Sequence, residues 1–269
     1  MRLARGRALA AATLCAAASC QHAKQAPPRA AAPKVAVAPA VPPPPPPPDP
    51  AQVARDALEA ARAKRLRIAQ AEQQAEPDTA AIAVEAQSCA ADARRAWAAL
   101  FPEAAAKRDR ERVGVDGAEP LYLEAVCAAT AARMQGFTPL IERQEELVAA
   151  LGRVVQLAPD LDGAGAEREL GALRAALPAY AGGDLDQALE HLLAALRRAP
   201  QDARNHLVLA RTVAVKAQDR ALFRDHLEAV LGLGDALAAA QADALLQRED
   251  ELFGPKGEAA QPIPGGPQR

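Results

Sequence analysis

Alanine is the most frequent residue of this chain and fills 72 of its 269 positions. Residues that favour strands are scarce by comparison, and aromatic residues make up only 3% of the chain. Leu, Arg, Glu and Gln are also abundant, and like alanine they lose little rotamer freedom in a helix. The composition therefore predicts an all-α fold and leaves little room for an all-β or doubly wound α/β architecture.

The charge balance bears on the class of partner. The formal net charge is -2 and the sequence pI is about 6.1. A nucleic-acid-binding protein normally carries a basic face or domain. We therefore expect no nucleic-acid partner.

The amino terminus has the pattern of an export signal. Arginines at positions 2, 5 and 7 precede the apolar run 8–18, which is too short for a membrane-spanning helix of about 20 residues but suits the core of a signal peptide. The run ends in Ala17-Ala18-Ser19-Cys20, which resembles a bacterial lipobox, although Ala17 stands where leucine is usual. We expect a lipoprotein signal peptide over residues 1–19 and lipid attachment at Cys20.

Two alternatives to this interpretation stay open. The signal could be a plain secretory one cleaved near Ala18, and Cys15 is a poorer acylation candidate than Cys20. We expect lipidation to place the protein in the periplasm, because acyl chains inserted in a bacterial membrane anchor a protein stably. Gln21, rather than aspartate, after the cysteine favours the outer membrane.

Residues 20–50 form a predicted proline-rich tether. Twelve prolines lie between Pro27 and Pro50, seven of them in the unbroken run 42–48. Such a segment adopts extended polyproline II and acts as a semi-rigid spacer. A ligand for an SH3-type domain is the alternative, but those domains are mostly cytoplasmic. A spacer between membrane and domain is the better interpretation.

Two cysteines remain in the mature chain, Cys89 and Cys127, both in predicted helices. Cysteines in an oxidising envelope are often paired, so we expect a disulfide between neighbouring helices. Two buried free thiols are the alternative. Two thiols without a nearby histidine do not suggest a zinc site.

A helical domain is predicted over residues 51–253, followed by a flexible tail over 254–269. Glycine and proline divide the domain into helical segments. The expected helices are 51–75, 79–100, 121–135, 138–157, 167–179, 185–198, 202–217, 220–233 and 236–252.

Paired helices of this kind suggest a repeat. Ala188, Leu192 and Ala195, closed by Pro200, match the second half of a tetratricopeptide unit. Ala229 follows Ala195 by 34 residues, while a similar closing pattern at Pro159 lies 41 residues before Pro200. The pattern predicts a degenerate tetratricopeptide-like helical-hairpin solenoid, with unrelated amphipathic hairpins as the alternative.

Three blocks between Tyr122 and Phe253 add a family resemblance. They are 182–188 (GGDLDQA), 218–223 (QDRALF) and 244–253 (ALLQREDELF). In order and spacing they resemble the T component of tetratricopeptide-associated TRAP transporters, the TatT lipoprotein family. The resemblance implies a helical lipoprotein that works with a periplasmic solute-binding protein and a membrane permease, in uptake of apolar or acidic organic solutes.

We find no catalytic site in the sequence. The four histidines are dispersed at positions 22, 191, 206 and 226, and no metal-protease, hydrolase or phosphate-binding motif occurs. The acidic residues recur at helical spacing, which is typical of a solvated face. We expect a non-enzymatic protein with no metal and no cofactor.

Solenoids bind partners along an extended concave groove. In the best-matched helix pair, the first helix offers Arg204, Leu207, Arg211 and Val215 at helical spacing, and we expect these four residues to bind an acidic partner or a carboxylate ligand. Arginines that are merely solvated are the alternative for the site. For the whole protein, the alternative to transport is a scaffold for an envelope assembly without a small-molecule ligand. Homo-oligomerisation stays open.

Overall fold

The computed structural model describes residues 48–74 and 76–254, and in these ranges the chain forms helices and no strand. The all-α prediction is confirmed. The predicted signal peptide, the acylation site at Cys20, nearly all of the tether and all of the tail after Gly254 lie outside the described residues.

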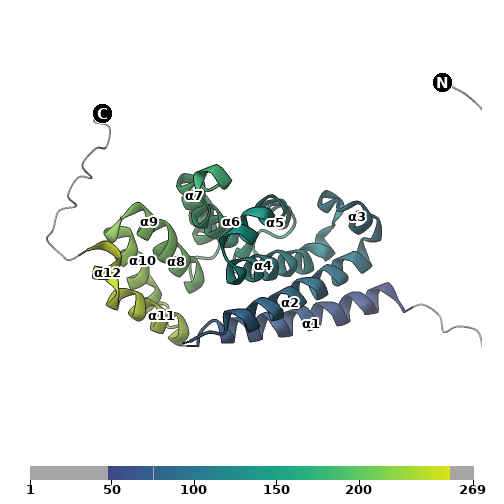
Figure 1. The fold of residues 1–269 in the computed structure, drawn as a ribbon, viewed down its shortest axis with the longest axis horizontal. Helices are drawn as coiled ribbons and strands as arrows, with labels where there is room; N and C mark the ends of the chain where they lie inside the picture. Colours follow the sequence, from purple (N-terminus) through teal and green to yellow (C-terminus); the bar gives the residue numbers. More distant parts are fainter. Residues whose placement is uncertain (1–47, 75, 255–269) are drawn as a thin grey trace, which may run out of the picture. The chain divides into compact units, whose positions relative to one another are not determined.

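Eight helices of twelve or more residues build the described part of the chain (Figure 1). They are α1 (Pro50–Ala71), α2 (Thr79–Leu100), α4 (Ala118–Gln135), α5 (Phe137–Leu157), α6 (Gly165–Ala176), α7 (Leu185–Arg198), α10 (Arg220–Gly232) and α11 (Ala236–Gln247). Shorter helices lie between and after them: α3 (Pro102–Lys107), α8 (Ala203–Leu209), α9 (Val215–Ala217), α12 (Glu249–Phe253), the 3-10 turns η1 (Arg110–Arg112), η2 (Val115–Gly117) and η3 (Ala179–Ala181), and the π-helical turn η4 (Ala210–Ala214).

Aspartate begins six of these helices. In each, the carboxylate of the residue before the helix accepts a hydrogen bond from a backbone N–H of the first turn, which has no partner within the helix. The six caps are Asp49, Asp78, Asp184, Asp202, Asp219 and Asp235, before α1, α2, α7, α8, α10 and α11. Where each of these helices begins is therefore encoded locally.

Helix α4 is the centre of the amino-terminal half. It is apolar almost all round, as expected of a buried helix, and most of its residues are buried. It packs against α2 on one side and α5 on the other, while α1 pairs with α2 (Figure 1). Six of its eighteen residues are alanine, whose small side chains allow neighbouring helices to pack against it.

Several expected helix boundaries were wrong, among them the start of α4, which lies at Ala118 rather than 121. The first helix ends at Ala71 rather than 75, because the chain must turn before Pro77 and the Asp78 cap. The helix expected at 167–179 is α6, which ends at Ala176, since Pro178 holds Leu177 in an extended conformation (φ -75°, ψ 152°). The helix expected at 236–252 is broken at Arg248 (φ -97°, ψ 8°) into α11 and α12.

The spacing of buried residues follows the predicted repeat in part. Ala188, Leu192 and Ala195 of α7 are fully buried, and their counterparts on α5, Leu147, Leu151 and Val154, precede them by 41 residues. On α10 the buried trio follows by 35 residues and consists of Phe223, Leu227 and Val230. The proposed equivalence of Ala229 with Ala195, at 34 residues, was therefore wrong by one position. The tetratricopeptide assignment itself stays a prediction.

The two cysteines of the domain meet between α2 and α4. The Sγ atoms of Cys89 and Cys127 are joined at 2.05 Å, and the Cα atoms lie 5.9 Å apart. Both residues are completely buried. The bond joins two of the helices that form the amino-terminal core.

Candidate binding groove

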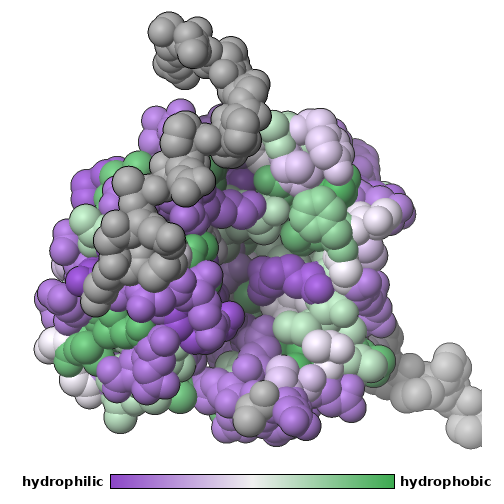
Figure 2. Space-filling model, turned by 60° about the vertical axis from the view of Figure 1, so that its left-hand side comes forward, coloured by the Kyte–Doolittle hydropathy of each residue, from purple (hydrophilic) through white to green (hydrophobic). Residues whose placement is uncertain are grey.

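A groove of about 970 Å³ lies between helices that are far apart in the sequence. Residues of α6, α8, η4 and α11 line it, together with the carboxyl-terminal parts of α1 and α4. Its apolar lining comes mostly from alanine and leucine, including Ala172, Leu173, Leu207 and Leu237. Figure 2 brings the carboxyl-terminal helices forward and shows a hollowed face bordered by both hydrophilic and hydrophobic residues.

Three of the four residues expected to bind a partner line this groove: Arg204, Leu207 and Arg211. Val215 does not; it is half-buried and packs against the core that α8 and η4 form with α10 and α11. The π-helical turn at Ala210–Ala214 explains the difference. A π turn holds more residues than an α turn, so the residue after it is rotated away from the face that regular spacing predicts.

Arg204 is occupied by neighbouring carboxylates. Its guanidinium lies 2.8 Å from Asp162 Oδ1 and 2.6 Å from Asp202 Oδ2. The hydrogen bond to Asp202 and the nearby charge of Asp162 raise the pKa of Arg204. Burial lowers the pKa, but by less. Arg204 therefore holds the loop after α5 to the start of α8, and its charge is already compensated.

Behind Arg204 lies a buried polar cluster around Arg168, which is only 4% exposed. The Arg168 guanidinium donates to Asn205 Oδ1 at 3.0 Å and pairs with Asp162 at 3.0 Å. Tyr122 donates its hydroxyl hydrogen to the same Asp162 carboxylate at 2.6 Å. Buried charges of this kind are tolerated when they are paired and hydrogen-bonded. The cluster fixes the groove wall from behind.

Arg211 is in a different situation. No hydrogen bond or ion pair joins its guanidinium to another residue in the described part of the chain. Burial in the groove lowers its pKa, and the nearby Glu169 opposes that effect. Arg211 is thus the predicted residue whose guanidinium donors are open to a ligand or partner.

Glu169 of α6 is the acidic centre of the groove. Burial by itself would raise the pKa of this carboxyl, but Arg133, Arg168, Arg65 and Arg211 together outweigh it and the pKa is lowered. The nearest of these pairs is Arg133 Nη1 to Glu169 Oε2, at 3.6 Å. Glu72 adds a second carboxylate here, 3.5 Å from Arg65, so the arginines about Glu169 are partly paired.

The groove residues outside α8 and η4 were not predicted from the sequence. Arg65, Arg133, Glu169 and Leu237 come from α1, α4, α6 and α11. No local pattern links these positions, because only the packing of the helices brings them to one face. Leu237, which is 50% exposed, is a large apolar residue open to contact there.

The histidines of the described residues, His191, His206 and His226, make pairwise contacts. His191 Nδ1 lies 2.7 Å from Glu167 Oε2, and His206 Nδ1 lies 2.9 Å from His226 Nδ1. Within residues 48–74 and 76–254, no group of three potential ligands could hold a metal ion. Ser88, the one serine after Ser19, accepts a hydrogen bond from the Lys64 ammonium at 2.7 Å, and that lysine also pairs with Asp92.

The helices that the structure describes include none long and apolar enough to cross a membrane. The family model of the TRAP transporter T-component (TAtT) matches residues 49–253. A search of curated proteins found no significant match to this chain.

Proposed function

The chain belongs to the TRAP transporter T-component family, and from this premise we propose that its groove docks a periplasmic solute-binding protein, or the ligand of that protein. Family membership gives the chain a role in TRAP transport and its association with that system. Together with the all-helical fold, it favours a non-enzymatic role. The solutes in question are small apolar or acidic organic molecules.

One observation carries the proposal: a large groove that combines apolar walls with four arginines against three carboxylates. Arg65, Arg133 and Arg211 lie about Glu169, and alanine and leucine side chains line much of the remaining wall. Partner surfaces are recognised by apolar area, while complementary charge steers the encounter. An acidic surface with an apolar centre, or a carboxylate with an apolar body, fits this lining.

We further propose that the protein is a periplasmic lipoprotein held by Cys20, on the outer membrane in preference to the inner one. The residues around Cys20 support this assignment, as does Gln21 after it. The Cys20→Ser variant should then leave the membrane fraction for the soluble one and lose metabolic labelling by a fatty acid. If it stays in the membrane fraction without label, another part of the chain holds it there.

In-cell crosslinking tests the docking role. A photo-crosslinking amino acid at position 237 should capture a solute-binding protein as the main adduct, identified by mass spectrometry. The same amino acid at position 180, where Tyr180 is 85% exposed and does not line the groove, should not.

Charge reversal at the groove gives the matched control. Arg211→Glu should reduce the adduct at position 237 by about tenfold, because it places a negative charge against an acidic partner. Arg197→Glu makes the same change on α7 at an exposed position that does not line the groove and should leave the adduct unchanged. Equal capture by both variants contradicts docking at the groove.

A tetratricopeptide-like scaffold for an envelope assembly, without a small-molecule ligand, remains the second candidate function. It gives a different crosslinking result, namely outer-membrane or secretion proteins as the main adducts and no solute-binding protein. Adducts between two copies of the chain would instead indicate a homo-oligomer.

A further inference from the structure

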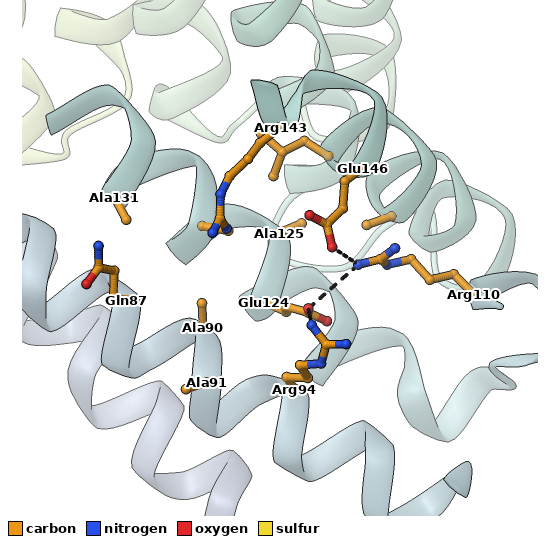
Figure 3. A pocket seen from close by; sticks show the side chains of 13 residues that line it. Gln87, Ala90, Ala91, Arg94, Arg110, Glu124, Ala125, Ala131, Arg143 and Glu146 are labelled. Atoms are coloured by element: carbon orange, nitrogen blue, oxygen red, sulfur yellow. Dashed lines mark hydrogen bonds and ion pairs between the residues drawn. The ribbon is translucent and has the colours of Figure 1, made fainter. Parts of the chain in front are cut away.

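A second cavity, of about 270 Å³, opens between α2, α4 and α5 (Figure 3). It shares no lining residue with the groove. Its volume is somewhat below the usual range for ligand pockets, about 300–1,000 Å³, and suits a molecule of few atoms.

Small apolar side chains form the floor and lower walls of this cavity. Ala125, Ala128 and Ala131 follow one another along one face of α4, and all three are buried. Leu147 and Ala150 of α5 complete the apolar lining on that side. Alanine side chains leave room above the helix, and a hydrocarbon body placed there would lose contact with water.

Charged side chains gather at one part of the cavity (Figure 3). Arg94, Arg110 and Arg143 contribute three positive charges, and Glu124 and Glu146 contribute two negative ones. Arg110 bridges the two carboxylates: its Nη2 lies 2.5 Å from Glu146 Oε1 and 3.7 Å from Glu124 Oε1. One positive charge is left over.

Arg143 carries that excess. Figure 3 shows its side chain reaching from α5 toward the α4 floor, and no hydrogen bond or ion pair joins its guanidinium to any residue in 48–74 or 76–254. Its charge also acts on Glu146 at longer range. Burial raises the pKa of the Glu146 carboxyl, but Arg110 and Arg143 lower it, and the net shift is downward. Its guanidinium donors are therefore open to a ligand.

Arg110 and Arg94 add unused donors. The Nε–H of Arg110 is buried and has no acceptor among the described residues, a costly state for a buried polar group. Arg94 makes only a distant contact, 3.9 Å from Glu124 Oε1. A planar guanidinium suits a carboxylate because it can bind both oxygens at once.

We propose that this cavity binds a small organic carboxylate, with its carboxylate on Arg143 and Arg94 and a short hydrocarbon body on the alanine floor of α4. The proposal does not depend on the function of the groove. Glu124 does not prevent it, because one of its oxygens accepts the Trp97 indole hydrogen bond at 2.5 Å and the other faces Arg94 and Arg110.

The fluorescence of Trp97 can report whether a ligand binds in this cavity. It is the single tryptophan of the chain, it is buried, and its indole donates to Glu124 in the cavity wall. An anion bound beside Glu124 changes the electric field at the indole. Tryptophan fluorescence should therefore respond saturably to hexanoate, and much less to 1-hexanol, which has a chain of the same length and no charge.

Three variants test the assignment on the full chain. Arg143→Gln should weaken hexanoate binding by about tenfold or more, as expected for the loss of a charge-assisted hydrogen bond. Glu146→Gln should strengthen binding several-fold, because it removes one of the two negative charges that line the cavity. Arg197→Gln, the same change outside the cavity, should leave binding unchanged, and circular dichroism verifies that each variant is folded.

The opposite results overturn the proposal. An absent or non-saturable response to hexanoate shows that no carboxylate site exists. Equal binding of 1-hexanol shows an apolar cavity without anion recognition. Equal affinity in Arg143→Gln and Arg197→Gln places any binding elsewhere. Because groove docking is read by crosslinking at position 237, failure here leaves that proposal standing.

Discussion

At the scale of single residues, Arg204 and Arg211 have different roles although the sequence places them on one helix face. Arg204 and Arg211 stand on the same predicted face, seven positions apart. In the structure Arg204 is fully engaged by Asp162 and Asp202, whereas Arg211 has open donors in the groove. The sequence showed the residue type and the spacing, but Asp162 reaches Arg204 from a loop that only tertiary folding brings close.

His226 is the histidine whose protonation bears on folding, and it contacts His206. Their Nδ1 atoms are 2.9 Å apart, so one ring donates and the other accepts, and the pair holds a single proton at that contact. Burial lowers the pKa of His226 from 6.5, His206 lowers it further, and Asp225 opposes the shift. The folded state therefore disfavours the protonated His226 that the unfolded chain accepts.

We predict that stability falls as the pH drops below about 6.5, because the unfolded chain binds a proton at His226 that the folded protein resists. In His226→Gln, which can keep the hydrogen bond without titrating, the free energy of unfolding should fall less steeply between pH 7 and 5. Urea unfolding at several pH values measures both slopes. Parallel curves for the two proteins would contradict this role of the histidine pair.

At the scale of helices, most segments are predictable because their signals are local. Aspartate caps and the prolines at 77 and 178 mark starts and stops. The break at Arg248 was missed because it accompanies a distant contact: Glu249 after the break binds Arg224 of α10 through both oxygens, at 2.6 Å each. The π-helical turn at Ala210–Ala214 was missed as well, and it displaced Val215 from the groove.

Gly171 lies where α6 packs closely against α7, so a substitution there tests this helix contact. A Cβ atom there would lie 2.5 Å from Leu192 Cγ and 2.9 Å from the Ala188 carbonyl oxygen. Since that oxygen is backbone and cannot move aside cheaply, Gly171→Ala should lower the free energy of unfolding by about 1–3 kcal/mol.

Gly152 is the matched control, because it also lies inside a helix and a Cβ there would meet nothing within 4 Å. Gly152→Ala should raise the free energy of unfolding by about 0.5–1 kcal/mol through helix propensity. Urea unfolding compares the two variants. Effects of the same sign would show that α6 and α7 are not in close contact.

At the scale of the whole molecule, contacts between distant segments organise the core and the groove. Cys89 and Cys127 join α2 to α4 over 38 positions, and the family match of residues 49–253 covers nearly all of the described helices. We propose that the bond is a permanent one, formed in an oxidising compartment.

Removing the disulfide should lower the free energy of unfolding by about 4 kcal/mol, the value that chain entropy gives for a loop of this length. Urea unfolding of the Cys89→Ala, Cys127→Ala double variant measures this loss. The parent protein, unfolded in a strong reductant, should lose the same amount of stability. Rapid thiol alkylation of the native protein without reductant would instead indicate free cysteines.

The amino-acid sequence alone determined the all-α class, most of the helical segments and the family, because propensity, capping and motif order are encoded in neighbouring residues. The tertiary structure alone decided which side chains meet. The groove gathers Arg65, Arg133, Glu169 and Leu237 from four helices, and the second cavity depends on α2, α4 and α5 meeting about small alanines. Such sites have no local signal, since packing and charge pairing act between residues that are distant along the chain.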